Sequence, residues 1–262
     1  MAIRDILKKA DSKVSKETFS DADIISALEG LDRSSLLKLD VKSIPDELKS
    51  MFQFLLEVSF AGKSRKTKVF HPSSLSYSPC PRKDFYELSG VTQTNSFATD
   101  TELQITFDVG HFWHKYIQFH LWYKGVAEIE LTVDIPEYKI YGHADGRLKV
   151  RGKLAVLKIK TMDTNRFSRL TEPLPYHIKQ ATIYAKGLDA ELIVFVYVDK
   201  NKGKRKIYVV VPDEGMWAEV KRYCFDVTKA VRAKTPPKRV CGDELSERAM
   251  SCPYRDHCFN LK

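Results

Sequence analysis

Residues 142–160 read GHADGRLKVRGKLAVLKIK, and they lie in two strand-like runs, Tyr138–Val150 and Leu154–Thr161. The first run carries one carboxylate, Asp145, and the second carries Lys158 and Lys160. Because alternate side chains of a strand share a face, both lysines point to the same side of the second strand. A hairpin between the two runs therefore brings Asp145 close to the lysine pair.

The segments around this hairpin predict a mixed α/β domain. Helices are expected over residues 84–90, 101–123, about 175–188 and about 214–232. Further strands are expected at residues 127–133 and, as a hairpin, at 191–199 and 205–211. Residues 71–81 contain three prolines and four serines and are expected to form a loop. This order of elements indicates one main sheet with helices packed against it.

The composition excludes several classes of protein. Of the 262 residues, 43% are hydrophobic and 29% are charged, as in a globular domain. No apolar run approaches the roughly 20 residues that cross a bilayer, and the first residues lack the apolar stretch of a signal peptide. We therefore expect no membrane partner and a cytoplasmic location. The net charge of +9 favours a polyanionic partner such as nucleic acid.

Three short motifs connect this hairpin to the helices on either side of it. They are GHFWH at residues 110–114, GHAD at 142–145 and QATIY at 180–184. In order and spacing they resemble the PD-(D/E)XK nuclease superfamily, and within it the RecB-like branch. The resemblance implies a restriction-endonuclease-like fold, a mixed central sheet flanked by helices. It divides the chain into an N-terminal helical region, residues 1–70, and a nuclease core, residues 71–262.

The resemblance also implies which residues act. His114, Asp145 and the carbonyl of Ile159 would hold Mg²⁺ or Mn²⁺, and Lys160 would position or activate the attacking water. Gln180 and Tyr184 share one helical face beside this site. The implied activity is that of a metal-dependent DNA exonuclease or end-processing nuclease, acting on single-stranded ends in a bacterial, archaeal or phage-infected cell. Recombination, replication or CRISPR-adaptation proteins are the implied partners.

One position departs from the family pattern. The family places an acid two residues before the catalytic lysine, and this chain has Lys158 there. A lysine removes an oxygen ligand and adds an ammonium where a divalent cation would bind, so metal binding should weaken severely. A natural pseudo-nuclease, an acid that has migrated to another position and a deliberate inactivating substitution are all open explanations. The candidates for a migrated acid are Glu128, Glu130 and Asp163.

The cysteines strengthen the resemblance. Cys80 precedes the core, and Cys241, Cys252 and Cys258 follow it. This distribution resembles the subgroup that contains the AddB nuclease domain and the CRISPR-adaptation exonucleases. In that subgroup one N-terminal and three C-terminal cysteines hold a [4Fe–4S] cluster that joins the two ends of the core. Zinc held by the same thiolates, or by a set that includes His257, is the alternative.

Several residues have a plain structural interpretation. Cys224 lies among apolar residues of the last helix and is expected to be a buried small side chain. His114 can be a packed helix residue rather than a ligand, and Tyr184 can pack rather than touch DNA. The aromatic residues of 112–123 more often form core than a platform for bases. The alternative function is a dead nuclease fold that binds DNA, with Arg147, Lys149, Lys158 and Lys160 contacting phosphates.

Overall fold

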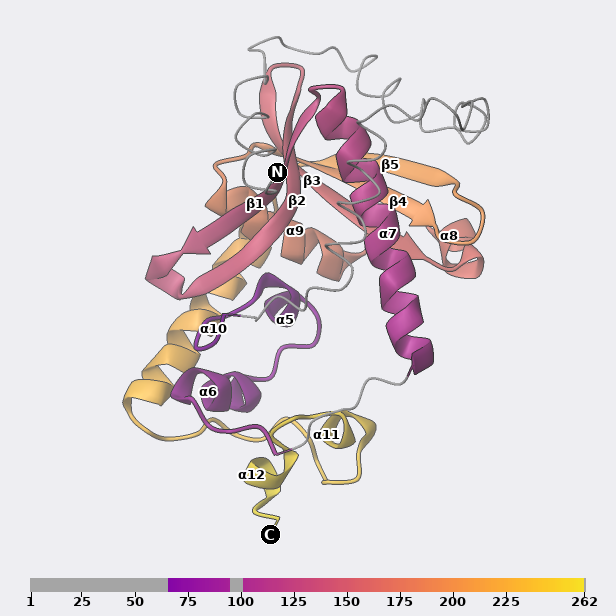
Figure 1. The fold of residues 1–262 in the computed structure, drawn as a ribbon. Coiled ribbons are helices and arrows are strands. Elements are labelled where there is room, and N and C mark those ends of the chain that lie inside the picture. Colours follow the sequence, from indigo (N-terminus) through magenta and orange to yellow (C-terminus); the bar gives the residue numbers. More distant parts are fainter. Residues whose placement is uncertain (1–65, 95–100, 262) are drawn as a thin grey trace, which may run out of the picture.

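The computed structural model describes residues 66–94 and 101–261. The predicted N-terminal helical region, residues 1–70, lies almost entirely outside the described residues. Figure 1 shows a central sheet with helices on both faces and a group of short helices below it. The predicted mixed α/β class is confirmed. In the part of the chain that is described, no helix is both long and apolar enough to cross a bilayer.

The sheet has five strands in the order β1-β2-β3-β4-β5. They are β1 (Ala127–Ile135), β2 (Ile140–Val150), β3 (Lys153–Met162), β4 (Leu192–Asp199) and β5 (Arg205–Val210). β3 and β4 run parallel, and every other neighbouring pair is antiparallel. The parallel pair requires a crossover, which α8 (Thr164–Arg169) and α9 (Pro175–Gly187) supply.

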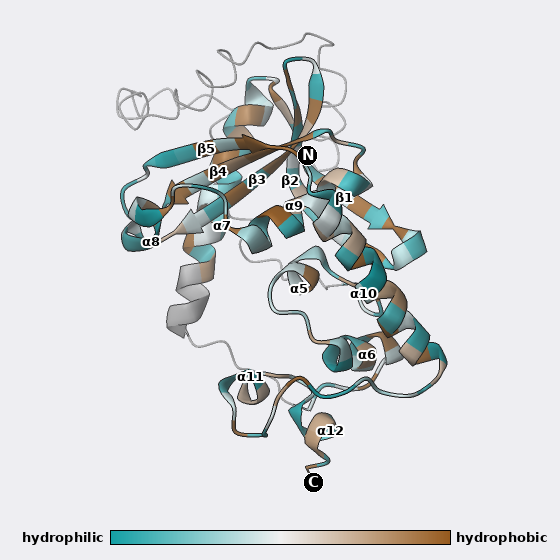
Figure 2. Ribbon diagram, turned by 180° about the vertical axis from the view of Figure 1, so that it is seen from behind, coloured by the Kyte–Doolittle hydropathy of each residue, from teal (hydrophilic) through white to brown (hydrophobic). Residues whose placement is uncertain are grey.

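The two faces of the sheet carry separate apolar cores. The helix α7 (Thr101–Tyr123) packs Ile117 and Leu121 against one face, where Leu157 and Ile159 of β3 are fully buried. The helix α9 packs Ala181 and other small or aromatic side chains against the opposite face. Figure 2 shows the apolar strands enclosed between these helices. Because β3 is buried on both faces, its polar side chains are held in a low-dielectric layer.

A third layer joins the two ends of the described core. It contains α5 (Pro72–Ser76), α6 (Pro81–Ser89), the 3-10 turn η2 (Pro136–Tyr138) and α10 (Glu214–Arg232), with the tail helices α11 (Glu247–Met250) and α12 (Arg255–Phe259). Buried Tyr86 of α6 donates to the carbonyl of His257 at 3.2 Å, and Tyr254 packs in the same apolar cluster. Segments far apart in sequence therefore lie side by side here (Figure 1).

The predicted loop at residues 71–81 is wrong in part. Pro72 starts α5 and Pro81 starts α6, each in the first turn of its helix. A proline is tolerated there because its missing N–H has no partner inside the helix in any case. Two of the three prolines that suggested a loop, Pro72 and Pro81, are therefore helix starts. As predicted, Gly90 ends α6, with a left-handed φ of 73° that a side chain would strain.

Candidate functional site

The site forms where β2 and β3 separate. Their ladder pairs Gly146 with Leu157 and is not continued to Asp145 and Lys158. The side chain of Asp145 enters this gap, and its Oδ2 accepts a hydrogen bond of 2.7 Å from the backbone N–H of Ile159. The carboxylate thus takes the place of a missing ladder bond. The backbone N–H of Ile159 is thus directed at Asp145, and the role of its carbonyl as a metal ligand remains a prediction.

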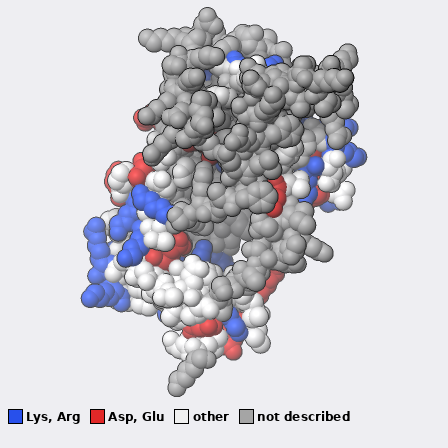
Figure 3. Space-filling model, viewed as in Figure 1, with Lys and Arg blue, Asp and Glu red and all other residues white. Residues whose placement is uncertain are grey.

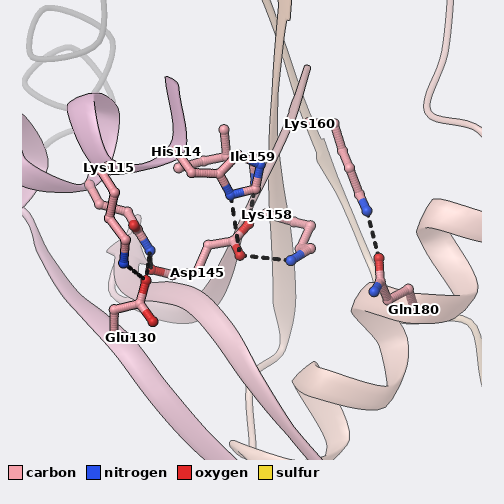
Figure 4. A network of polar contacts seen from close by, with 9 residues as sticks. His114, Lys115, Glu130, Asp145, Lys158, Ile159, Lys160 and Gln180 are labelled. Carbon is pink, nitrogen blue, oxygen red and sulfur yellow. Dashed lines mark hydrogen bonds and ion pairs between the residues drawn. The ribbon is translucent and has the colours of Figure 1, made fainter. Parts of the chain in front are cut away.

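Lys158 neutralises this carboxylate. Its Nζ lies 2.7 Å from Oδ1 of Asp145, and the two residues are only 5% and 8% exposed. Burial alone would raise the pKa of Asp145, but the ammonium of Lys158 and the nearby His114 bring it well below its usual range. Burial alone would lower the pKa of Lys158, but Asp145 raises it. The pair is therefore ionised at neutral pH. Figure 4 shows the contact between the two side chains.

His114 reaches the same carboxylate from the opposite face. Its Nδ1 lies 3.7 Å from Oδ1 of Asp145. Four residues earlier, α7 passes so close to β3 that a Cβ on Gly110 would lie 3.3 Å from the Oγ1 of Thr161. A small residue at Gly110 lets the helix approach and directs His114 into the gap. The spacing of GHFWH thus has a physical cause.

Lys160 meets α9 beside the ion pair. Its Nζ donates to Oε1 of Gln180 at 2.6 Å (Figure 4). Tyr184, one turn further along α9, packs in the core with its ring 5.2 Å from the ammonium of Lys158. A Cβ on Gly142 would lie 3.2 Å from this ring, so β2 needs a glycine there. All the predicted catalytic residues, Asp145, Lys158, Lys160, Gln180 and Tyr184, are brought together, and their roles remain predictions.

The electrostatics of the site favour an anion near Lys160. Burial and, to a smaller extent, Lys158 lower the pKa of Lys160 to about 7, while Asp145 opposes the shift. An incoming phosphate would favour the protonated form and be bound by it. Burial lowers the pKa of His177 to about 3, and both lysines act in the same direction. His177 is therefore neutral and pairs with the hydroxyl of Tyr197 at 2.8 Å.

Glu130 is the acid that lies nearest to the site. It lies where the register of β1 and β2 is interrupted, between the pairs Ile129–Gly146 and Leu131–Ala144, and its φ of 54° is rare for a side-chain-bearing residue in a strand. Lys115 pairs with its carboxylate, and Gln118 donates to it at 3.0 Å and to the carbonyl of Asp145 at 2.6 Å. Sequence reasoning proposed Glu130 only as one of three alternatives, because its conformation leaves no signal in the sequence.

The other two candidates for a migrated acid are engaged elsewhere. Glu128 forms a two-pronged pair with Arg147 on the neighbouring strand, at 2.8 and 2.9 Å. Asp163 caps α8 by accepting from the N–H of Arg166 at 2.9 Å. Arg147, which was expected to contact a phosphate, is thus engaged by Glu128. Of the three acids, Glu130 is the one linked to Asp145, through Gln118, although its carboxylate is also engaged by Lys115.

The residues present do not fit a divalent metal ion. Both oxygens of Asp145 are occupied, one by an ammonium and one by an amide. Over the described ranges, no group of three His, Cys, Asp or Glu side chains is arranged to hold a metal ion. Mg²⁺ requires near-octahedral oxygen ligands, and a lysine offers none. Asp145 is therefore already balanced by a cation of the chain itself.

The four cysteines of the predicted cluster converge on a second site. Cys80, Cys241, Cys252 and Cys258 line one pocket together with Lys83, Tyr86 and Arg255. Burial raises the pKa of the Cys252 and Cys258 thiols, and Cys80 adds to both shifts. The ten residues between Cys241 and Cys252 do not keep them apart, because α11 folds the chain back on itself. Cys224, as expected, is instead buried in the core.

The described residues contain no group of three His, Cys, Asp or Glu side chains arranged to hold a metal ion, at this pocket or elsewhere. His257, the alternative ligand, is held by the carbonyl of Thr92 at 2.9 Å and does not line the pocket. Arg82 and Arg239 act on the Cys258 thiol in the direction that favours thiolate. Cationic neighbours of this kind suit an anionic iron–sulfur centre.

Comparison with known proteins adds distant structural similarity. No protein-family model matches the chain, and no curated protein matches its sequence. The crystal structure of SSO0001 is 22% identical, with a TM-score of 0.46, over 78% of this chain and 94% of that chain. An alkaline exonuclease, LHK-Exo from Laribacter hongkongensis, is 16% identical, with a TM-score of 0.46, over 68% of this chain and 93% of that chain. The structure of LHK-Exo in complex with dAMP is 17% identical, with a TM-score of 0.46, over 64% of this chain and 90% of that chain.

Proposed function

We propose that this chain binds single-stranded DNA ends at a nuclease-type site whose metal-dependent hydrolysis is blocked by its own Lys158. The observation that carries the proposal is the buried pair of Lys158 and Asp145, at 2.7 Å, in the gap between β2 and β3. His114, Lys160 and Gln180 surround this pair with groups that can bind a phosphodiester. The internal ammonium supplies the positive charge that a metal ion would otherwise bring to Asp145.

The charge distribution supports an anionic partner. The chain carries nine more basic than acidic residues. Figure 3 shows Lys and Arg side chains gathered over the region where Figure 1 places α10. That helix contributes Lys221, Arg222, Lys229 and Arg232. A basic surface on the same domain as the site raises the local concentration of nucleic acid and speeds its encounter with the protein.

Binding of labelled single-stranded DNA tests the proposal. We expect binding in EDTA without cleavage, and an affinity that falls steeply with salt because each bound phosphate releases counterions. Lys160→Gln is expected to weaken binding to all sequences alike and to reduce the salt slope by about one. Lys153→Gln is the matched control, since Lys153 is exposed and pairs with Glu191. Fluorescence anisotropy over a salt series measures both effects.

Two results of this experiment contradict the proposal. Absence of DNA binding removes it entirely. Metal-dependent cleavage by the unmutated chain would instead favour a second candidate, an active hydrolase in which Glu130 supplies the missing acid. The link from Glu130 through Gln118 to the backbone of Asp145 is the observation behind this candidate. Loss of that cleavage in Glu130→Gln, with DNA binding retained, would identify it.

We further propose that the cysteine pocket holds a [4Fe–4S] cluster joining Cys80 to the tail. The four thiols would ligate the iron, and the cluster would link α6 to the segments that bear α11 and α12. Its role in this proposal is structural, because it lies among helix ends rather than at the Lys158–Asp145 pair. Binding of the cluster would then contribute to the stability of the fold.

Iron analysis of anaerobically purified protein tests the cluster. We expect brown protein with the broad visible absorbance of thiolate-bound clusters and about four irons per chain. Cys80→Ser is expected to lose the iron and to melt about 5 °C or more below the unmutated chain. The control is Cys224→Ala, which is expected to keep its iron because Cys224 lies outside the pocket. Colourless protein with one zinc per chain would contradict this proposal.

A further inference from the structure

Two exposed tyrosines meet at the entrance to α9. Tyr77 is 68% exposed and Tyr176 is 36% exposed, and their rings contact edge to face with centroids 5.1 Å apart. Single exposed aromatic residues are common on protein surfaces, but two in contact present a continuous apolar surface. Neither tyrosine belongs to the three motifs at residues 110–114, 142–145 and 180–184.

The pair lies one helical turn from the Lys160 contact. Tyr176 precedes Gln180 by four residues on α9, so the two side chains occupy the same face of the helix. One turn rises about 5.4 Å, a distance that a nucleotide can span between its phosphate and its base. Burial and Tyr77 raise the pKa of Tyr176, and Arg166 is close enough to lower it in opposition. Aromatic and cationic groups are thus adjacent.

Both rings are held in place before any ligand arrives. Tyr176 follows Pro175 in the first turn of α9 and packs on His177, with ring centroids 4.3 Å apart. Tyr77 ends α5, and the two carbonyls after it, those of Ser78 and Pro79, each accept a hydrogen bond of 3.0 Å from Arg248. A surface that is already ordered loses little conformational entropy when it binds a ligand.

From this arrangement we propose that Tyr77 and Tyr176 form a platform on which one nucleobase of a single strand stacks while its phosphate lies at Lys160 and Gln180. The inference rests on the proposed function and deepens it, because it names the residues that recognise a base of the single strand. A base paired within a duplex cannot present its face to a side chain, whereas a base of a single strand can. The platform therefore selects single-stranded DNA over duplex.

The platform has a direct connection to the cysteine pocket. Only two residues, Ser78 and Pro79, separate Tyr77 from Cys80, which lines that pocket. Arg248, which holds the intervening carbonyls, belongs to α11 between Cys241 and Cys252. The same tail segment therefore carries pocket cysteines and fixes the loop that bears Tyr77. A cluster bound in the cysteine pocket would therefore also hold the loop that bears Tyr77 in place for DNA binding.

Affinity for single-stranded oligonucleotides, measured in EDTA, tests the platform. Tyr77→Ala and Tyr176→Ala are each expected to weaken binding by about 5- to 100-fold, the range found for a base that stacks on an aromatic ring. Tyr77→Phe and Tyr176→Phe keep the ring and are expected to bind like the unmutated chain. Tyr123→Ala is the matched control, since this tyrosine is 59% exposed at the far end of α7. All the variants change surface residues, and their melting temperatures verify folding.

A series of strands with one abasic site at successive positions tests whether a base is what binds. We expect one position at which the missing base weakens binding by the unmutated chain, and we expect the alanine variants to be insensitive to that position. Alanine variants that bind like the unmutated chain, or that remain equally sensitive to the abasic site, would overturn the platform and leave the proposed function intact. No binding of any strand by the unmutated chain overturns both.

Discussion

Replacing Lys158 by glutamate is expected to raise Mn²⁺- or Mg²⁺-dependent cleavage of single-stranded DNA by on the order of 100-fold or more. The change removes the ammonium that occupies Asp145 and adds a second carboxylate beside it. Two adjacent carboxylates provide the oxygen ligands that hard divalent cations require, and charge stabilisation by a bound metal is worth several kcal/mol. A nuclease assay with each metal and with EDTA measures the gain.

Melting temperatures give a second measurement for Lys158→Glu. Without metal, two buried carboxylates repel each other, so the variant should melt below the unmutated chain in EDTA. Added Mn²⁺ should raise its melting temperature in a concentration-dependent way, because the ion binds only the folded state. The control is Lys158→Gln, which removes the ammonium without adding an acid and should gain neither cleavage nor a metal response. A correctly folded Lys158→Glu protein that cuts no better than the unmutated chain would show that this position is not the family's metal-ligand position.

Asp145→Asn is expected to lower the free energy of unfolding by about 3–5 kcal/mol, because it leaves the ammonium of Lys158 buried without a counter-charge. Adding Lys158→Met to this variant removes the stranded charge as well, and should restore most of the lost stability. Urea denaturation of the two single variants, the double variant and the unmutated chain measures the coupling between the two residues.

The loss of stability expected for Asp145→Asn has a matched control and should hold over a defined pH range. Lys179→Met breaks an exposed pair with Glu219 and should cost less than about 1 kcal/mol. The pKa of Asp145 is lowered and that of Lys158 is raised, so the stabilisation is lost only in strong acid or strong base. It should therefore stay constant from roughly pH 5 to pH 9. A double variant no more stable than Asp145→Asn would contradict the ion pair.

The helices and strands were predictable where the periodicity was strong. The long helix at residues 101–123 and the last helix at 214–232 have the predicted bounds. Their apolar residues recur at helical spacing over many turns, so local pattern and tertiary packing agree. The short helix α5 was missed because five residues contain too little periodicity, and the proline at its start is equally typical of a loop.

Which residues come close together at the site was predictable, but their detailed conformations and contacts were not. The hairpin register follows from strand alternation, so the approach of Lys158 to Asp145 could be inferred from the sequence. The left-handed backbone of Glu130 and the contact of Tyr77 with Tyr176 could not. Both depend on how segments distant in sequence pack, and no local pattern of residue types records that.

The order of residues alone determined the mixed α/β class, the hairpin and the types of side chain available for chemistry. These depend on periodicity and spacing, which are local properties of a chain. Only the tertiary structure decided that the pair of Asp145 and Lys158 is buried, that Gln118 links Glu130 to Asp145 and that four distant thiols share one pocket. The physical reason is that burial and close approach of charges set the energy of a polar group, and both arise only when β2, β3 and the helices pack together.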